Sequence, residues 1–154
     1  MTEQQRLLGW REWVQLPDLG LPVMKAKVDT GARTSCLHAF ALEIFNRDDT
    51  DWVRFSVHPI QANIDEVVEC EAPIVDRRPV RDSGGHTEER IVIKTSISLG
   101  NWRDEIEMTL TSRDDMRFRI LLGRTTIVAG NFIINPALSY AQGGHNEPII
   151  ETSL

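Results

Sequence analysis

Cysteine, basic charge and long apolar runs are all scarce in this sequence, and each shortage excludes a class of protein. The 154 residues include two cysteines, Cys36 and Cys70, which form no C-x-x-C pair, so neither a disulfide framework nor a redox motif is predicted. No apolar run approaches the roughly 20 residues that a membrane-spanning helix needs. Residues 1–6 are not followed by the apolar region of a signal peptide, so we expect a cytoplasmic protein without a membrane partner.

Acidic residues outnumber basic ones. The 23 Asp and Glu residues against 17 Lys and Arg residues give a formal net charge of −6 at pH 7, which argues against a nucleic-acid partner. The composition, with 41% hydrophobic and 26% charged residues, is typical of a globular protein. A chain of this length can bury a core without disulfides, so we expect a single domain over residues 1–154.

Motifs for nucleotide and metal binding are also missing. The sequence has no G-x-x-x-x-G-K-[ST] loop and no H-E-x-x-H frame, and the interpretation that we favour needs no cofactor and no metal. Zinc stays open as an alternative, because Cys36 and His38 would share one face of a strand and His86 begins a loose His-x-x-Glu. The candidate zinc ligands are Cys36, His38, His58, Cys70, His86 and His145.

One short stretch does describe a piece of chemistry. Residues 23–28 alternate as a half-buried strand does, and Asp29 follows directly at its end. Thr30 can donate a local hydrogen bond, and Gly31 lets the backbone turn back tightly. Ala32 leaves room above the carboxylate for a substrate chain. These residue types would hold an aspartate rigid and approachable, although an Asx-turn that merely closes a strand has the same pattern.

The Asp29-Thr30-Gly31-Ala32 stretch resembles the active-site loop of aspartic proteases, in particular the small retroviral-type enzymes. Residues 119–124, Arg-Ile-Leu-Leu-Gly-Arg, resemble the second signature of that fold. Residues 9–17, 25–35 and 83–90, in this order, extend the resemblance to a bacterial retropepsin-like family often labelled "ATP-dependent zinc protease". That family is associated with α-L-glutamate ligases of the RimK type, which add glutamates to a ribosomal protein. The resemblance covers about residues 8–140.

The fold that the resemblance implies is an all-β, retropepsin-like closed β-barrel with one short helix. The sequence pattern itself indicates an all-β barrel or sandwich, because many short strands alternate with turn signals and no repeated helix pattern is present. Residues 35–45 are apolar, which predicts strands buried on both faces. We expect Pro73 to break a strand at 67–72, and Gly130 to close a helix at 125–130.

A mechanism follows from the resemblance. Two carboxylates must share one proton, so that one activates water while the other protonates the carbonyl oxygen. The chain supplies one such loop, which implies a homodimer with Asp29 from each subunit at the two-fold axis. Asp82-Ser83-Gly84 also satisfies the pattern, but it lacks a preceding apolar strand and is better interpreted as a hairpin tip.

Candidate site residues lie in two segments. In the first, Asp29 is the catalytic carboxylate, held by Thr30 and Gly31, with Ala32 and Arg33 facing the substrate. In the second, a polar hairpin over residues 77–90 would cover a peptide substrate, with Arg81, Ser83, Gly84 and Gly85 as its contacts.

The hairpin arginines allow two interpretations. Arg77, Arg78 and Arg81 could bind the carboxylates of an acidic or glutamate-tailed peptide. Alternatively, they pair with Glu88 and Glu89 across the strands, which we favour slightly. The overall prediction is an aspartic endopeptidase. Two alternatives stay open, a non-catalytic peptide-binding or regulatory module of a glutamate-ligase system and a zinc-dependent peptidase.

Overall fold

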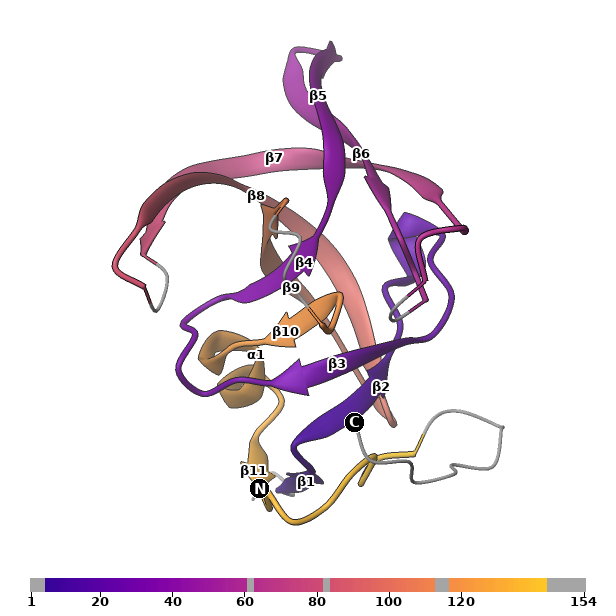
Figure 1. The fold of residues 1–154 in the computed structure, drawn as a ribbon, viewed down its shortest axis with the longest axis vertical. Coiled ribbons are helices and arrows are strands. Elements are labelled where there is room, and N and C mark those ends of the chain that lie inside the picture. Colours follow the sequence, from indigo (N-terminus) through magenta and orange to yellow (C-terminus); the bar gives the residue numbers. More distant parts are fainter. Residues whose placement is uncertain (1–4, 61–62, 82–83, 113–116, 144–154) are drawn as a thin grey trace.

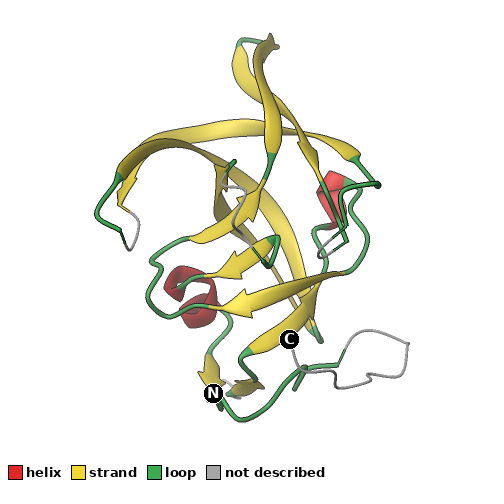
Figure 2. Ribbon diagram, in the orientation of Figure 1, coloured by secondary structure: helices red, strands yellow, loops and turns green. Residues whose placement is uncertain are grey.

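Strands make up most of the structure, a computed structural model that describes residues 5–60, 63–81, 84–112 and 117–143 (Figures 1 and 2). The described elements, in chain order, are β1 (Arg6–Leu8), β2 (Arg11–Val14), the 3-10 helix η1 (Pro17–Leu19), β3 (Met24–Val28), β4 (Ser35–His38), β5 (Phe40–Arg47), β6 (Thr50–Val57), β7 (Val68–Arg81), β8 (Thr87–Leu99), β9 (Trp102–Thr111), β10 (Ile120–Leu122), α1 (Arg124–Ala129) and β11 (Phe132–Ile134). The predictions of a mostly β fold and of one short α-helix are thus confirmed for this part of the chain.

The described strands pair into two sheets. The larger sheet has nine strands in the order β2-β3-β10-β4-β9-β8-β7-β6-β5, and β1 pairs with β11 in parallel. The hydrogen-bonded order does not return on itself within the described residues, so the closed barrel that we expected is not confirmed. A single isolated bridge between Gln15 and Ser98 does link the end of β2 to β8, which shows that the sheet curls strongly.

The hydrophobic core lies inside this curl. Side chains from β2, β3, β4, β6, β8, β9 and β10 contribute to it, and the largest of those that are fully buried include Phe55, Leu37, Ile93, Met108 and Ile120. In β6 the buried positions alternate, as expected for a strand with one face on the core. Burying each such side chain contributes about 1.5–3 kcal/mol, so the core holds the strands that carry the loops described below.

Two predictions for the middle of the chain need correction. Residues 35–45 are not buried throughout, because β4 is buried at all four positions whereas Leu42 and Ile44 of β5 are 39% and 45% exposed. The reason is that β5 is the last strand of the large sheet and pairs with β6 alone. The β5–β6 hairpin projects from the body of the molecule, at the top of Figure 1.

Pro73 does not break its strand. β7 runs through it, pairing with β6 as far as Pro73 and with β8 from Ile74 onwards. Proline is tolerated in a strand where its missing N–H is not needed for a ladder, and the change of pairing partner provides such a position. The result is a long strand that bridges the β5–β6 hairpin and the rest of the sheet.

The predicted short helix and its end are confirmed. α1 ends at Ala129, and the Gly130 N–H donates to the Thr126 carbonyl over 3.1 Å. A Cβ at Gly130 would overlap the ring of Phe132, so glycine is required for the chain to turn into β11. No helix in the described part of the chain is long and apolar enough to cross a membrane.

Glu12, on β2, ties together segments that are far apart in the sequence. Its side chain is fully buried and accepts hydrogen bonds from the backbone N–H groups of Gly9 (2.6 Å), Ala141 (3.0 Å) and Gln142 (3.0 Å). Charge-assisted hydrogen bonds of this kind compensate the cost of burying a carboxylate. The chain after β11 is therefore fastened to the start of β2.

We expect Glu12→Ala to lower the free energy of unfolding by about 3 kcal/mol, because a buried donor that loses its partner costs about 1–3 kcal/mol. Urea denaturation followed by circular dichroism would measure the change. The matched control is Glu105→Ala, whose side chain is 60% exposed beside Lys94 and which should cost no more than about 0.5 kcal/mol. Equal effects of the two substitutions would contradict this assignment.

Candidate active site

Asp29 lies at the point where β3 ends beside β10. The two strands are parallel, with Val28 opposite Leu122, and the Asp29 N–H donates to the Leu122 carbonyl over 2.9 Å. β10 also pairs with β4 on its other side. The loop that joins β3 to β4 therefore begins and ends on either side of one short central strand, which fixes both of its ends (Figure 1).

Within the loop, backbone donors hold the Asp29 side chain. The Gly31 N–H donates to Asp29 Oδ1 over 3.0 Å, and the Ala32 N–H donates to the Asp29 carbonyl over 3.2 Å. A Cβ at Gly31 would lie 3.1 Å from Oδ1, so a larger residue would crowd this oxygen. The half-buried carboxylate is thus oriented by its own loop, in the geometry of an Asx-turn.

The start of α1 supports the same loop through hydrogen bonds to its backbone. The N–H groups of Arg124 and Thr125 donate to the carbonyls of Ala32 and Arg33, each over 2.9 Å. Arg124 also reaches over with its side chain, and its Nη1 donates to the Thr30 carbonyl over 2.8 Å. Because the first N–H groups of a helix have no partner within the helix, the loop carbonyls satisfy them while the helix positions the loop.

A buried hydroxyl pair completes the support, and we did not foresee it. Ser35 Oγ accepts a hydrogen bond from the Gly123 N–H over 3.0 Å and lies 2.6 Å from Thr126 Oγ1. A Cβ at Gly123 would lie 2.6 Å from the Thr34 carbonyl carbon, so the close approach depends on glycine. Polar residues at the start of a buried strand and inside an apolar helix are the signal that could have revealed this pair.

The predicted site residues around Asp29 and on the hairpin form two groups. Thr30, Gly31 and Arg33 are exposed and Ala32 is half-buried, so the loop presents them around Asp29. The hairpin residues Arg81, Gly84 and Gly85 are exposed at the far end of the β7–β8 hairpin, where Gly85 has φ 85°. In Figure 1 this hairpin arches towards the side of the molecule on which the β3–β4 loop lies. Asp82 and Ser83 lie outside the described residues.

Most hairpin arginines are engaged, but with other partners than we expected. Arg78 pairs with Asp76 (2.6 Å) and Glu107 (2.7 Å), and Arg77 approaches Asp51 (3.8 Å). The hydrogen bond from the Arg78 guanidinium holds the pKa of Asp76 below its ordinary value, with a further contribution from the Arg77 backbone N–H. Arg81 makes no ion pair with any described residue, which leaves it available to a ligand.

The base of the hairpin contacts the strand that follows the loop. Arg90 Nη1, on β8, lies 3.6 Å from Cys36 Sγ on β4. Of the other candidate zinc ligands, His86 is exposed at the hairpin end and Cys70 is buried on β7, whereas His38 and His58 line one pocket. The described residues contain no group of three or more His, Cys, Asp or Glu side chains that could hold a metal ion. His145 lies outside the described residues.

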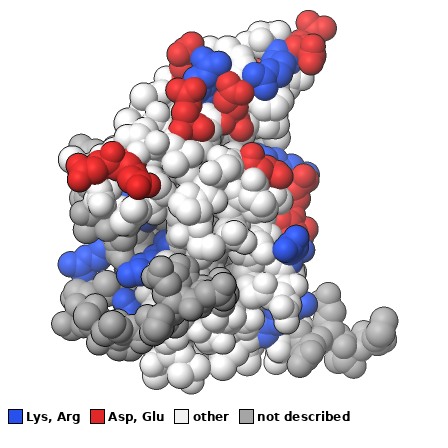
Figure 3. All heavy atoms as spheres, turned by 90° about the vertical axis from the view of Figure 1, so that its right-hand side faces the viewer, with Lys and Arg blue, Asp and Glu red and all other residues white. Residues whose placement is uncertain are grey.

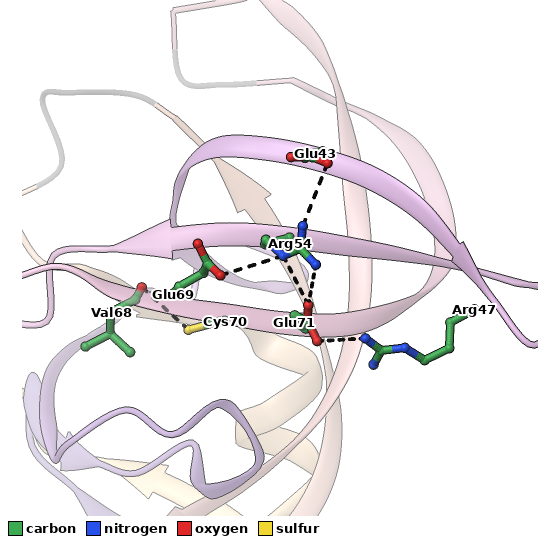
Figure 4. A network of polar contacts seen from close by, with 7 residues as sticks. All are labelled: Glu43, Arg47, Arg54, Val68, Glu69, Cys70 and Glu71. Atoms are coloured by element: carbon green, nitrogen blue, oxygen red, sulfur yellow. Dashed lines mark hydrogen bonds and ion pairs between the residues drawn. The ribbon is translucent and has the colours of Figure 1, made fainter.

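A separate charge network belongs to the sheet rather than to the loop. On β5–β7, Arg54 pairs with Glu71 over 2.9 Å and approaches Glu43 and Glu69, while Arg47 bonds Glu71 over 3.0 Å (Figure 4). Hydrogen bonds from Arg47 and Arg54 hold the pKa of Glu71 below its ordinary value.

The surroundings of this network indicate a structural role. Figure 3 shows acidic and basic side chains interleaved at this upper end of the molecule. Burial raises the pKa of the neighbouring Cys70 thiol to about 11, which makes it a poor nucleophile.

Comparison with known proteins supports the resemblance. Residues 7–145 match the RimB-like family, described as retropepsin-like aspartic endopeptidase RimB. One relative, from Desulfotalea psychrophila, is named "Probable alpha-L-glutamate ligase". It is 43% identical to this chain, and the match covers 90% of this chain and 30% of the relative. A second relative of the same name, from Shewanella halifaxensis, is 40% identical, and the match covers 98% of this chain and 33% of that relative. The chain thus spans about a third of the length of these curated relatives.

A solved structure shares the fold. The crystal structure of a protein of unknown function from Legionella pneumophila aligns with a TM-score of 0.76 and 27% identity, covering 90% of this chain and 99% of that one. The family match extends over both signatures, the Asp29 loop and the Gly123-Arg124 turn that braces it. The chain therefore belongs to the RimB-like family of retropepsin-like aspartic endopeptidases.

Proposed function

We propose that this chain is an aspartic endopeptidase that hydrolyses peptide bonds through a pair of Asp29 carboxylates, one from each subunit of a homodimer. The observation that carries the proposal is the support of Asp29. Its backbone is fixed by Leu122, its carboxylate by Gly31, and its loop by Arg124. A structural Asx-turn needs only the second of these contacts, whereas a catalytic carboxylate has to be held rigid from several directions.

The chemistry requires the second subunit. One Asp29 carboxylate takes a proton from water, and the oxygen of that water attacks the peptide carbonyl carbon. The protonated Asp29 of the other subunit donates its proton to the carbonyl oxygen. The tetrahedral intermediate then breaks its C–N bond as a proton passes to the leaving nitrogen. No metal and no covalent intermediate is needed, and the exposed Thr30 and Gly31 can face a two-fold axis.

An acidic peptide is the substrate class that we propose. Arg33 beside Asp29 and Arg81 on the hairpin are exposed arginines, and a guanidinium binds a carboxylate through two parallel hydrogen bonds. Relatives that carry a similar segment are named as glutamate ligases, which fits a substrate rich in glutamate.

The direct test is Asp29→Asn. We expect this substitution to lower the rate of hydrolysis of glutamate-rich peptides by at least about 100-fold, because general acid and base catalysis is removed. Cleavage can be followed by mass spectrometry of the products.

Asp104→Asn, the same change at an exposed aspartate on β9, provides the control and should cleave as the wild type does. Full activity of Asp29→Asn would contradict the proposal. A zinc mechanism would replace the proposal if a chelator abolished the activity of both the wild type and Asp29→Asn, and if substitution of His38 or His86 also removed that activity.

A second candidate function is a peptide-binding or regulatory module. It is favoured by one observation, namely that the chain matches only about a third of relatives named as ligases. The same variant separates the two functions. Binding of a glutamate-rich peptide without cleavage, equal in the wild type and Asp29→Asn, would favour the module.

Arg124 is a positioning residue in this account. We expect Arg124→Met to lower kcat by about tenfold or more with little change in KM, because the Thr30 carbonyl loses its donor and the loop shifts. Arg124→Lys should restore part of kcat, since an ammonium can donate to the same carbonyl. Arg103→Met removes an exposed arginine from β9 and should leave kcat unchanged; a kcat loss equal to that of Arg124→Met would contradict the assignment.

A further inference from the structure

A pocket lies at the other end of β10 from Asp29. It has a volume of about 330 Å³ and is lined by His38, Phe40, His58, Ile64 and Arg119. Arg119 directly precedes β10, whereas Asp29 is bonded to Leu122 at its end. A cavity of this size with a few polar groups among apolar ones is typical of small-ligand sites. The pocket is therefore a site separate from the Asp29 loop.

Arg119 provides a fixed positive charge in the pocket wall. The residue is only 8% exposed. Its Nε donates to the His58 carbonyl over 3.1 Å, and its own carbonyl accepts a hydrogen bond from the His38 N–H over 2.8 Å. The guanidinium is thus anchored to His58 and the Arg119 backbone to His38, so the side chain loses little conformational freedom when it binds a ligand.

The two histidines add polar groups of defined position. The His58 ring stacks on Phe40 with 4.4 Å between ring centroids and 22° between planes. Its Nδ1 lies 3.1 Å from the Glu66 carbonyl; because a carbonyl can only accept, Nδ1 carries a proton and Nε2 is the remaining polar atom of the ring. His38 is 4% exposed at the end of β4.

We propose that this pocket binds a carboxylate group carried on a short hydrocarbon chain. The guanidinium is a donor suited to a carboxylate, and His58 Nε2 donates to one in the imidazolium form, in which both ring nitrogens carry a proton. The lining described here includes no Asp or Glu. Phe40 and Ile64 would cover the methylene groups, which inorganic phosphate lacks. The site goes beyond the proposed peptidase function, because none of its residues belongs to the loop that carries Asp29.

The test uses proton NMR of the histidine rings in the full chain carrying Asp29→Asn, so that no peptide can be cleaved by the proposed mechanism. The probes are glutarate, for a free carboxylate, N-acetyl tetraglutamate amide, for the side chains of an acidic peptide, and inorganic phosphate, for an anion without methylene groups. We expect saturable shifts of the His58 and His38 resonances with at least one carboxylate probe, and none for His86. Binding of glutarate identifies a free ligand, and binding of the peptide alone identifies a peptide subsite.

Substitutions connect the shifts to the pocket. Arg119→Met should weaken binding by at least about tenfold, the lower end for a hydrogen bond to a charged group. His58→Phe, which keeps the stack on Phe40, should weaken binding of the probe by about threefold or more. This variant tests the proposal even if Arg119→Met does not fold. Arg103→Met, far along β9, should bind as before. Absence of saturable shifts, shifts with phosphate alone, or equal binding by His58→Phe would overturn the proposal.

Discussion

The structure depends on the position of one three-residue strand, β10, between β3 and β4. Its parallel pairing with β3 places Leu122 where its carbonyl holds the backbone of Asp29. Its antiparallel pairing with β4 fixes the other end of the same loop. The chain then turns at Gly123, where no larger residue fits, and α1 begins directly beneath the loop carbonyls. Two segments about 90 residues apart in sequence thereby form one rigid support.

Patterns along the sequence were sufficient to predict those parts of the fold that depend on neighbouring residues alone. The alternating strand before Asp29, the turn at Gly31 and the short helix closed by Gly130 were all predicted, because each depends on a residue's own backbone preference. The resemblance of residues 119–124 to the second signature pointed to this segment, and the structure supplies the contact of Arg124 with the Thr30 carbonyl.

Features that depend on distant partners were not predictable in this way. Pro73 looks like a strand breaker until β7 is seen to change neighbours there, and Ile44 looks like a core residue until β5 proves to be an edge strand. The Ser35–Thr126 hydroxyl pair and the pocket around Arg119 join residues from separate strands and loops. A pattern read along the chain carries no information on which of these segments meet.

The measurement that tests the central claim most directly is a crystal structure of the purified protein at acidic pH, with the distance between the Asp29 carboxylates of neighbouring subunits. Our account predicts a two-fold dimer in which carboxyl oxygens of the two residues lie within about 3 Å of each other, close enough to share a proton. A monomer in solution, or a dimer that holds the two Asp29 side chains far apart, would contradict a shared catalytic pair.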